Sequence, residues 1–187
     1  MIRFWLAGVA AMISLPQCIS AQTVDAQQPY ADIQSRAIKA LSDEEIADLR
    51  AGRGMGFALP AELNGYPGPR HVLDFAEKLG LTEDQKDKTE ALFASMEAET
   101  IPLGMELISQ EEALDRMFAE KTADPTSLSN ATALIGETQG ELRAAHLRYH
   151  IEMTEFLTPH QMRIYAKLRG YDGPSNGSQH GSGSHAH

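Results

Sequence analysis

Two long segments with the hydrophobic periodicity of a helix restrict most strongly what this chain can fold into. Between residues 82 and 121, apolar residues recur every three or four positions and form one stripe along a helix. This stripe comprises Leu92, Phe93, Met96, Leu103, Leu107, Leu114, Met117 and Phe118. Pro102 lies inside this segment and predicts a bend or one broken turn.

The second segment follows Asp124-Pro125, a pair typical of an N-cap and a first helical position. Its apolar stripe comprises Leu128, Ile135, Leu142, Tyr149, Met153 and Phe156. Because the link around Ala123 is short, the two helices must run antiparallel and bury their stripes against each other.

Shorter helices are predicted on both sides of this pair. A capping box at Ser42 and Glu45 opens a helix that ends near Gly52. Turn-forming residues and a proline predict another helix over 69–80, and a last one covers 159–169. No segment shows sustained strand alternation. The predicted fold is therefore all-α, a long antiparallel helical hairpin with short flanking helices.

The N-terminal residues have the pattern of a secretory signal peptide. Arg3 precedes an apolar, uncharged run over 4–15, which is too short to span a bilayer. Cys18 suggests lipidation, but the bulky Gln17 before it makes a lipoprotein the less favoured interpretation. We therefore expect an exported, soluble protein. Its predicted segments are a signal peptide (1–21), an N-terminal lead-in (22–40), a helical domain (41–170) and a disordered histidine-rich tail (171–187).

Composition excludes several classes of function. Acidic residues outnumber basic ones by 26 to 16, giving a net charge of -10, so nucleic acid is not an expected partner. A single cysteine rules out an internal disulfide framework and any CxxC site. The sequence has no nucleophile elbow, HExxH motif or phosphate-binding loop. We therefore expect a protein without enzymatic activity and without an organic cofactor.

A five-residue motif occurs twice, as Leu81-Thr82-Glu83-Asp84-Gln85 and as Leu157-Thr158-Pro159-His160-Gln161. In each copy the threonine can cap a helix while the glutamine caps back. Two Leu-Thr-x-x-Gln copies on an exported helical hairpin resemble the Spy/CpxP family of periplasmic proteins, whose hallmark is a doubled LTxxQ motif. The chain is also similar to the related metal-resistance proteins ZraP and CnrX. The resemblance covers residues 41–170.

This resemblance implies a hairpin that dimerises into a curved cradle in the periplasm. It also implies two activities, namely ATP-independent protection of unfolding proteins and binding of divalent metals. We therefore expect a homodimeric stress protein that serves heavy-metal or envelope stress, with metal and unfolded envelope proteins as partners. The alternative is a CnrX-like metal-sensor domain that signals to a membrane partner. The acidic charge departs from the more basic concave face of Spy-like chaperones and favours the role in metal stress.

Candidate metal ligands lie on the second long helix. His146 and His150 are four residues apart and project from one face, where neutral imidazoles can hold Zn²⁺ or another divalent transition metal. In CnrX-like sensors a methionine sulfur joins the histidines, and Met153 occupies a matching place before the motif. Tyr149 stands where a histidine would be expected. The alternative for the histidine pair is a half-buried structural role with hydrogen bonds to carboxylates or carbonyls.

The histidines of the tail are a second candidate. They are His180, His185 and His187. Histidine-rich polar tails capture metal weakly, and ZraP-like proteins carry comparable segments. A solvated tail without a role is the equally weighted alternative.

Two surfaces are candidates for a partner. Ile101, Met105 and Ile108 form a second apolar strip on the first long helix, and Gly136 and Gly140 lie on a small-residue face of the second. Exposed apolar patches often mark interfaces, so these residues predict a dimer contact first and a client contact second. The alternative is that Pro102 turns the strip inward onto the core.

Overall fold

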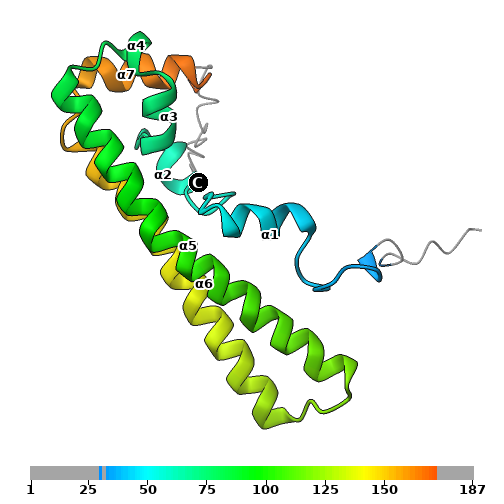
Figure 1. Cartoon of the computed structure of the whole chain (residues 1–187). Helices are drawn as coiled ribbons and strands as arrows, with labels where there is room; N and C mark the ends of the chain where they lie inside the picture. Colours follow the sequence, from blue (N-terminus) through cyan, green and yellow to red (C-terminus); the bar gives the residue numbers. More distant parts are fainter. Residues whose placement is uncertain (1–29, 31–32, 172–187) are drawn as a thin grey trace, which may run out of the picture. The chain divides into compact units, whose positions relative to one another are not determined.

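The computed structural model describes Tyr30 and residues 33–171, and every regular element in these ranges is an α-helix. Residues 33–171 lie in one compact unit, which begins at Ile33. Two helices are long: α5 (Glu83–Ala119) has 37 residues and α6 (Pro125–Thr154) has 30. They pack side by side as an antiparallel pair (Figure 1). The predicted all-α class and the pair of long helices are confirmed.

Five short helices flank this hairpin. They are α1 (Asp43–Arg50), α2 (Leu59–Glu62), α3 (Pro69–Asp74), α4 (Ala76–Leu79) and α7 (Pro159–Leu168). The capping box predicted at Ser42 and Glu45 is present at α1. The single helix predicted over 69–80 is divided at Phe75 into α3 and α4. The sequence analysis did not predict α2, which is one turn long and has no side-chain cap.

The helix α5 continues through Pro102 without a break, so of the bend or broken turn predicted there, the broken turn does not occur. Because Pro102 has no N–H, one carbonyl in the preceding turn loses its intrahelical hydrogen bond. Pro102 is exposed, so this carbonyl lies on the side of α5 that faces water. The contacts that α1 and α6 make with the other sides of α5 stabilise it as a continuous helix.

Buried apolar side chains form two clusters along the hairpin. The first joins Ile38, Leu49, Leu107, Ile108, Ile135 and Leu142. The second joins Val72, Leu79, Met153, Leu157 and Tyr165. Ile38 belongs to the predicted lead-in, and the backbone N–H of Lys39 donates to Asp115 Oδ1 at 3.2 Å. The packed unit therefore begins before residue 41.

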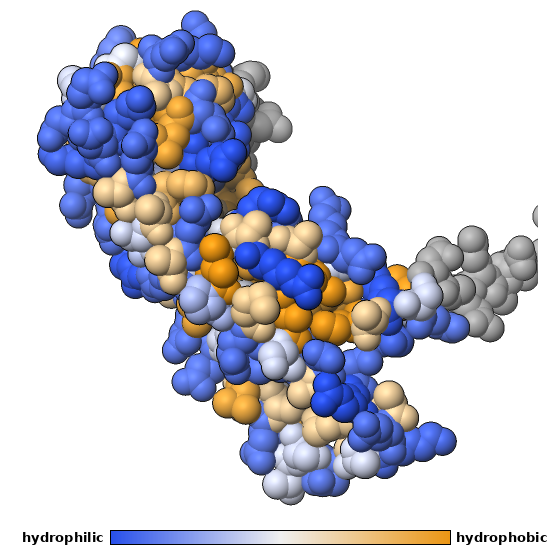
Figure 2. Space-filling model, viewed as in Figure 1, coloured by the Kyte–Doolittle hydropathy of each residue, from blue (hydrophilic) through white to orange (hydrophobic). Residues whose placement is uncertain are grey.

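The close fit of α1 against α5 depends on Gly104. A Cβ atom at Gly104 would lie 2.4 Å from the carbonyl oxygen of Leu49, so only glycine permits this approach. The space-filling view shows apolar residues gathered where α1 meets α5, while hydrophilic residues cover most of the remaining face in view (Figure 2). The N-terminal segment thus covers one side of the hairpin.

The two LTxxQ motifs meet in space. Thr82 and Thr158 cap α5 and α7, and in both copies the glutamine side chain bonds back to the backbone N–H of the threonine. Gln85 Nε2 then donates to Gln161 Oε1 at 3.0 Å, and Gln161 Nε2 donates to Gln85 Oε1 at 2.8 Å. The predicted helix-capping role of these four residues is confirmed, and the glutamines also join the two motifs to each other.

Within residues 30 and 33–171, no helix has the length and apolar character needed to cross a membrane. The predicted signal peptide (1–21) and most of the histidine-rich tail (172–187) lie outside the described residues.

Candidate functional site

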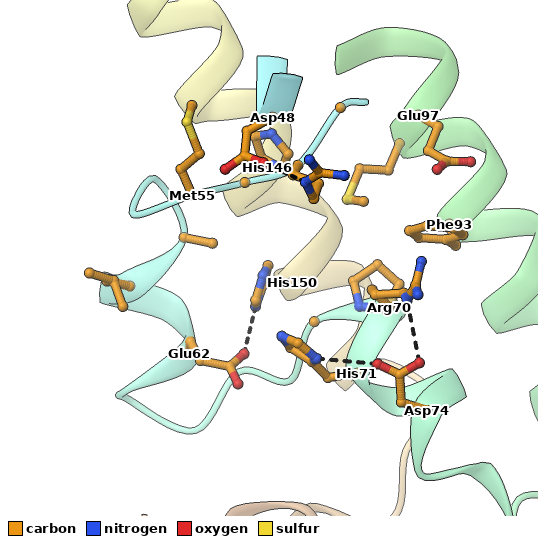
Figure 3. Close-up of a pocket in the computed structure, with 18 of the residues that line it drawn as sticks. Asp48, Met55, Glu62, Arg70, His71, Asp74, Phe93, Glu97, His146 and His150 are labelled. Carbon is orange, nitrogen blue, oxygen red and sulfur yellow. Dashed lines mark hydrogen bonds and ion pairs between the residues drawn. The ribbon is translucent and has the colours of Figure 1, made fainter. Parts of the chain in front are cut away.

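A cavity of about 630 Å³ lies where the loops and helices between α1 and α3 cover α5 and α6. From α5, Phe93, Met96 and Glu97 line it, and from α6 the two predicted histidines, His146 and His150, do so (Figure 3). Cavities of this size with mixed apolar and polar walls are typical of small-ligand sites. We therefore treat this cavity as the candidate functional site.

His150 is held in place by the loop before α3. Its side chain is buried, and Nδ1 lies 2.7 Å from the carbonyl oxygen of Tyr66 and 3.7 Å from Glu62 Oε2. Because a carbonyl only accepts hydrogen bonds, Nδ1 carries the proton and Nε2 keeps the lone pair. Burial lowers the pKa of His150, against the opposing effects of the Tyr66 bond and the Glu62 charge. His150 is therefore neutral at neutral pH.

His146 is still more deeply buried, with 2% of its surface exposed. Its ring stacks on Phe57, and Nε2 has no hydrogen-bond partner among the described residues. Burial lowers the pKa of His146 to about 4, with a further lowering by the charge of His150 and an opposing effect of Glu99. A neutral imidazole with a buried, unpartnered nitrogen therefore lies at this cavity.

Two glycines let the covering loops lie directly on these rings. A Cβ atom at Gly54 would lie 3.2 Å from His146 Nδ1, and one at Gly68 would lie 2.8 Å from His150 Cε1. The sequence analysis used the glycines near residues 52–56 and 64–69 only as marks of loops and turns. The high density of glycines in these two segments is a sequence signal for close backbone approach to other residues.

Glu62 forms the polar corner of the cavity. Its Oε1 accepts hydrogen bonds from the hydroxyls of Tyr165 at 2.6 Å and Tyr171 at 3.0 Å, and from Arg169 Nε at 2.9 Å. Burial acts to raise the pKa of Glu62, but the tyrosine hydrogen bonds and the Arg169 charge outweigh it, so the pKa is lowered. Its Oε2 is buried and makes no hydrogen bond to the described residues. Sequence reasoning missed this cluster because α2 and α7 are far apart in the chain.

The other predicted metal ligands lie elsewhere. Met153 has no exposed surface and packs in the second apolar cluster, with Val72 and Leu79, rather than at the cavity. His180, His185 and His187 lie outside the described residues. Within the described part of the chain, no three His, Cys, Asp or Glu side chains are grouped so that they could hold one metal ion.

The predicted apolar strip on α5 is mostly covered. Ile108 is buried in the first apolar cluster, and Ile101 lies half-buried against Gly52, because α1 and its following loop pack on this side. Met105 alone remains exposed, so the strip does not form a free surface. Gly136 and Gly140 differ, since both are exposed and a Cβ atom there would meet nothing within 4 Å.

Comparisons with models of protein families, with characterised proteins and with solved structures find no match to this chain. The resemblance to the Spy/CpxP family therefore rests on the two LTxxQ motifs and their place on the hairpin. What this resemblance implies about function is accordingly a proposal.

Proposed function

We propose that this chain is a non-enzymatic periplasmic stress protein that binds a divalent transition metal in heavy-metal or envelope stress. The observation that supports this most is the pairing of the two LTxxQ motifs through Gln85 and Gln161 on a long helical hairpin. Because the two copies of the motif contact each other, the repeat has a structural role beyond starting two separate helices. Such a role is expected if the doubled motif is characteristic of a family.

His146 and His150 are the metal ligands that we propose. Both are neutral at neutral pH, and each has a nitrogen that no hydrogen bond to the described residues occupies. Neutral imidazole is a preferred ligand of Zn²⁺, Ni²⁺ and Cu²⁺, which act here as bound cargo or signal. Because the described residues supply no third ligand of the His, Cys, Asp or Glu type, we expect modest affinity. His180, His185 and His187 are the proposed source of further ligands.

Calorimetric titration with Zn²⁺ tests this assignment. We expect His146→Gln/His150→Gln to lose most of the heat of binding, and replacement of the three tail histidines by alanine to lose part of it. His160→Gln is the matched control, because His160 is exposed on α7 and does not line the cavity. Circular dichroism verifies that each variant keeps its helices. Equal zinc affinity of the double variant and the control would contradict the role of the helix pair.

Binding of unfolded clients is the second proposed activity. Several large apolar side chains on the hairpin are exposed, among them Phe118, Leu134 and Ile151. Apolar surface of this kind can hold an unfolding chain. We expect the protein to reduce aggregation of heated citrate synthase, and Phe118→Ser/Leu134→Ser to weaken that effect. The CnrX-like sensor alternative instead predicts zinc binding with no effect on aggregation.

The homodimer is also a proposal, and the Gly136/Gly140 face of α6 is its candidate contact. Small residues at such a face permit close helix approach, and nothing in the described chain covers it. Sedimentation equilibrium should detect a dimer that Gly140→Leu dissociates. A wild-type monomer at all concentrations would rule this contact out.

A further inference from the structure

Three arginines line the cavity, and each is anchored in the same way. In every case the Nε atom pairs with a carboxylate that also lines the cavity. The pairs are Arg53 with Asp48 at 2.6 Å, Arg70 with Asp74 at 3.3 Å, and Arg169 with Glu62 at 2.9 Å. These ion pairs hold the three guanidinium groups at the cavity wall, where the side chains of Arg53 and Arg70 remain exposed and that of Arg169 is partly buried.

The outer ends of these three guanidinium groups remain free. A guanidinium has five N–H donors, and the described residues accept none of the Nη hydrogens of Arg53, Arg70 and Arg169. Two arginines away from the cavity, Arg116 and Arg148, differ in that their Nη2 atoms bond to Glu112 and Glu99. The cavity wall therefore carries free Nη donors, the groups with which arginine binds carboxylates in proteins.

An apolar wall lies beside these donors. Arg70 stacks on the ring of Phe93, with its guanidinium carbon 5.7 Å from the ring centroid (Figure 3). Met96, three residues further along α5, also lines the cavity. Across the cavity, Met55 has a left-handed backbone with φ of 45° and an exposed side chain. A methionine in this sparsely populated conformation is unusual and is more frequent at functional sites.

The formal charges of the wall nearly balance, since three arginines stand against four carboxylates, so a carboxylate ligand depends on hydrogen bonds to the guanidinium groups rather than on net charge. Asp48, Asp74 and Glu62 are paired with the arginines, Asp74 also lies 3.5 Å from His71 Nδ1, and the other two cavity histidines, His146 and His150, are neutral at neutral pH. Glu97 is the exception, because it lines the cavity without an ion-pair partner among the described residues. Glu97 would repel a polyanion more strongly than an anion with a single charge. The chain's net charge of -10 has little effect on a ligand in the cavity, because salt screens charges more than about 8 Å away at physiological ionic strength.

We propose that this cavity binds a small carboxylate that carries an apolar chain. The carboxylate bonds to the free Nη groups of Arg53 and Arg70, and the apolar part lies against Phe93 and Met96. This chemistry is shared by medium-chain fatty acids and by apolar peptides with a free C-terminus. The inference does not depend on metal binding or on the stress function proposed above.

Isothermal titration of the purified protein in metal-free buffer tests the proposal. The probes are sodium decanoate, decyltrimethylammonium and decanol, each below its micelle-forming concentration, and N-acetyl-leucyl-phenylalanine. We expect binding of decanoate or of the acylated dipeptide, and no comparable binding of the cation or the alcohol. Tighter binding of decanoate would indicate a fatty acid as the ligand, and tighter binding of the acylated dipeptide would indicate a peptide C-terminus.

Arg53→Gln and Arg70→Gln each replace a proposed guanidinium donor group with a neutral polar side chain. We expect at least one of the two variants to bind decanoate about tenfold more weakly. Arg143→Gln is the control, because Arg143 is exposed on α6 away from the cavity, and its affinity should stay within about twofold of wild type. Phe93→Ala should weaken decanoate more than it weakens hexanoate. The proposal is overturned if no carboxylate binds, if the cation or the alcohol binds as well as decanoate, or if both arginine variants match the control.

Discussion

At the residue scale, the LTxxQ glutamines make bonds that a glutamate could not. In a capping box the third residue only has to accept a hydrogen bond, so glutamate serves as well as glutamine. Gln85 accepts from the Thr82 N–H at 3.1 Å, but its Nε2 also donates to the carbonyl of Phe156 at 2.8 Å and to Gln161 Oε1. The amide is required because it has a donor and an acceptor.

We therefore predict that Gln85→Glu destabilises the fold by about 1–3 kcal/mol, because the Phe156 carbonyl loses its donor and two acceptors face each other. Urea unfolding followed by circular dichroism measures the change. Glu45→Gln is the matched control, since the capping bonds of Glu45 involve only Ser42. Equal losses in the two variants would show that the paired glutamines act as ordinary caps.

His146 should make stability depend on pH. Burial lowers its folded-state pKa to about 4 from an ordinary value of 6.5, so the unfolded chain binds the proton more readily. Stability is then complete above about pH 6.5 and decreases as the pH falls toward 4, by about 2 kcal/mol at pH 5. Urea unfolding at pH 7 and pH 5 should show this decrease in the wild type and a smaller one in His146→Gln. If the free energy of unfolding decreased by the same amount in the variant, a group other than His146 would cause the pH dependence.

At the element scale, α1 is positioned by its contact with α5 at Gly104. Leu49 is buried there, and its carbonyl oxygen lies where any larger residue would place its Cβ atom. This contact places α1 over Ile108 and leads the following loop over the cavity. A change at Gly104 therefore affects α1 and the cavity together.

We predict that Gly104→Ala destabilises the protein by about 1–3 kcal/mol, because the added methyl group would force α1 away from α5. Gly140→Ala is the control in an exposed helical position, and at protein concentrations below those of the proposed dimer it should stabilise α6 by up to about 1 kcal/mol. Thermal unfolding of both variants gives the comparison. Stabilisation by both substitutions would mean that α1 does not pack closely at Gly104.

At the scale of the whole described unit, Glu62 connects segments that are distant in sequence. Its carboxylate joins α2 to α7 through Tyr165, and to the segment after α7 through Arg169 and Tyr171. It also lies 3.7 Å from His150 on α6. One buried carboxylate therefore joins the covering segment to the terminal helix, beside His150 of the hairpin.

Glu62→Gln should lower the free energy of unfolding by about 2 kcal/mol, because the charged acceptor of three hydrogen bonds becomes neutral. Helix content should stay unchanged, which circular dichroism verifies. Glu97→Gln changes another cavity carboxylate that has no ion-pair partner among the described residues, so it should have little effect. A smaller loss for Glu62→Gln than for Glu97→Gln would be inconsistent with this role of Glu62.

Local patterns in the sequence were sufficient for the helices and their starts. The apolar stripes predicted α5 and α6. Threonine with a glutamine three residues later predicted the caps at Thr82 and Thr158, and aspartate followed by proline predicted the cap at Asp124. The interpretation of Ile108 as a surface residue failed because periodicity shows which face is apolar but not what covers it. The burial of His146 depends likewise on covering loops.

The sequence by itself determined the all-α class, the hairpin and the capping role of the LTxxQ motifs, because each depends on residues a few positions apart. Only the tertiary structure decided that the two glutamines bond to each other, that Glu62 gathers three donors, and that three arginines share one cavity. These contacts join residues that are separated by tens of positions. They follow from how α1, α2 and α3 pack on the hairpin, and helical periodicity carries no information about that packing.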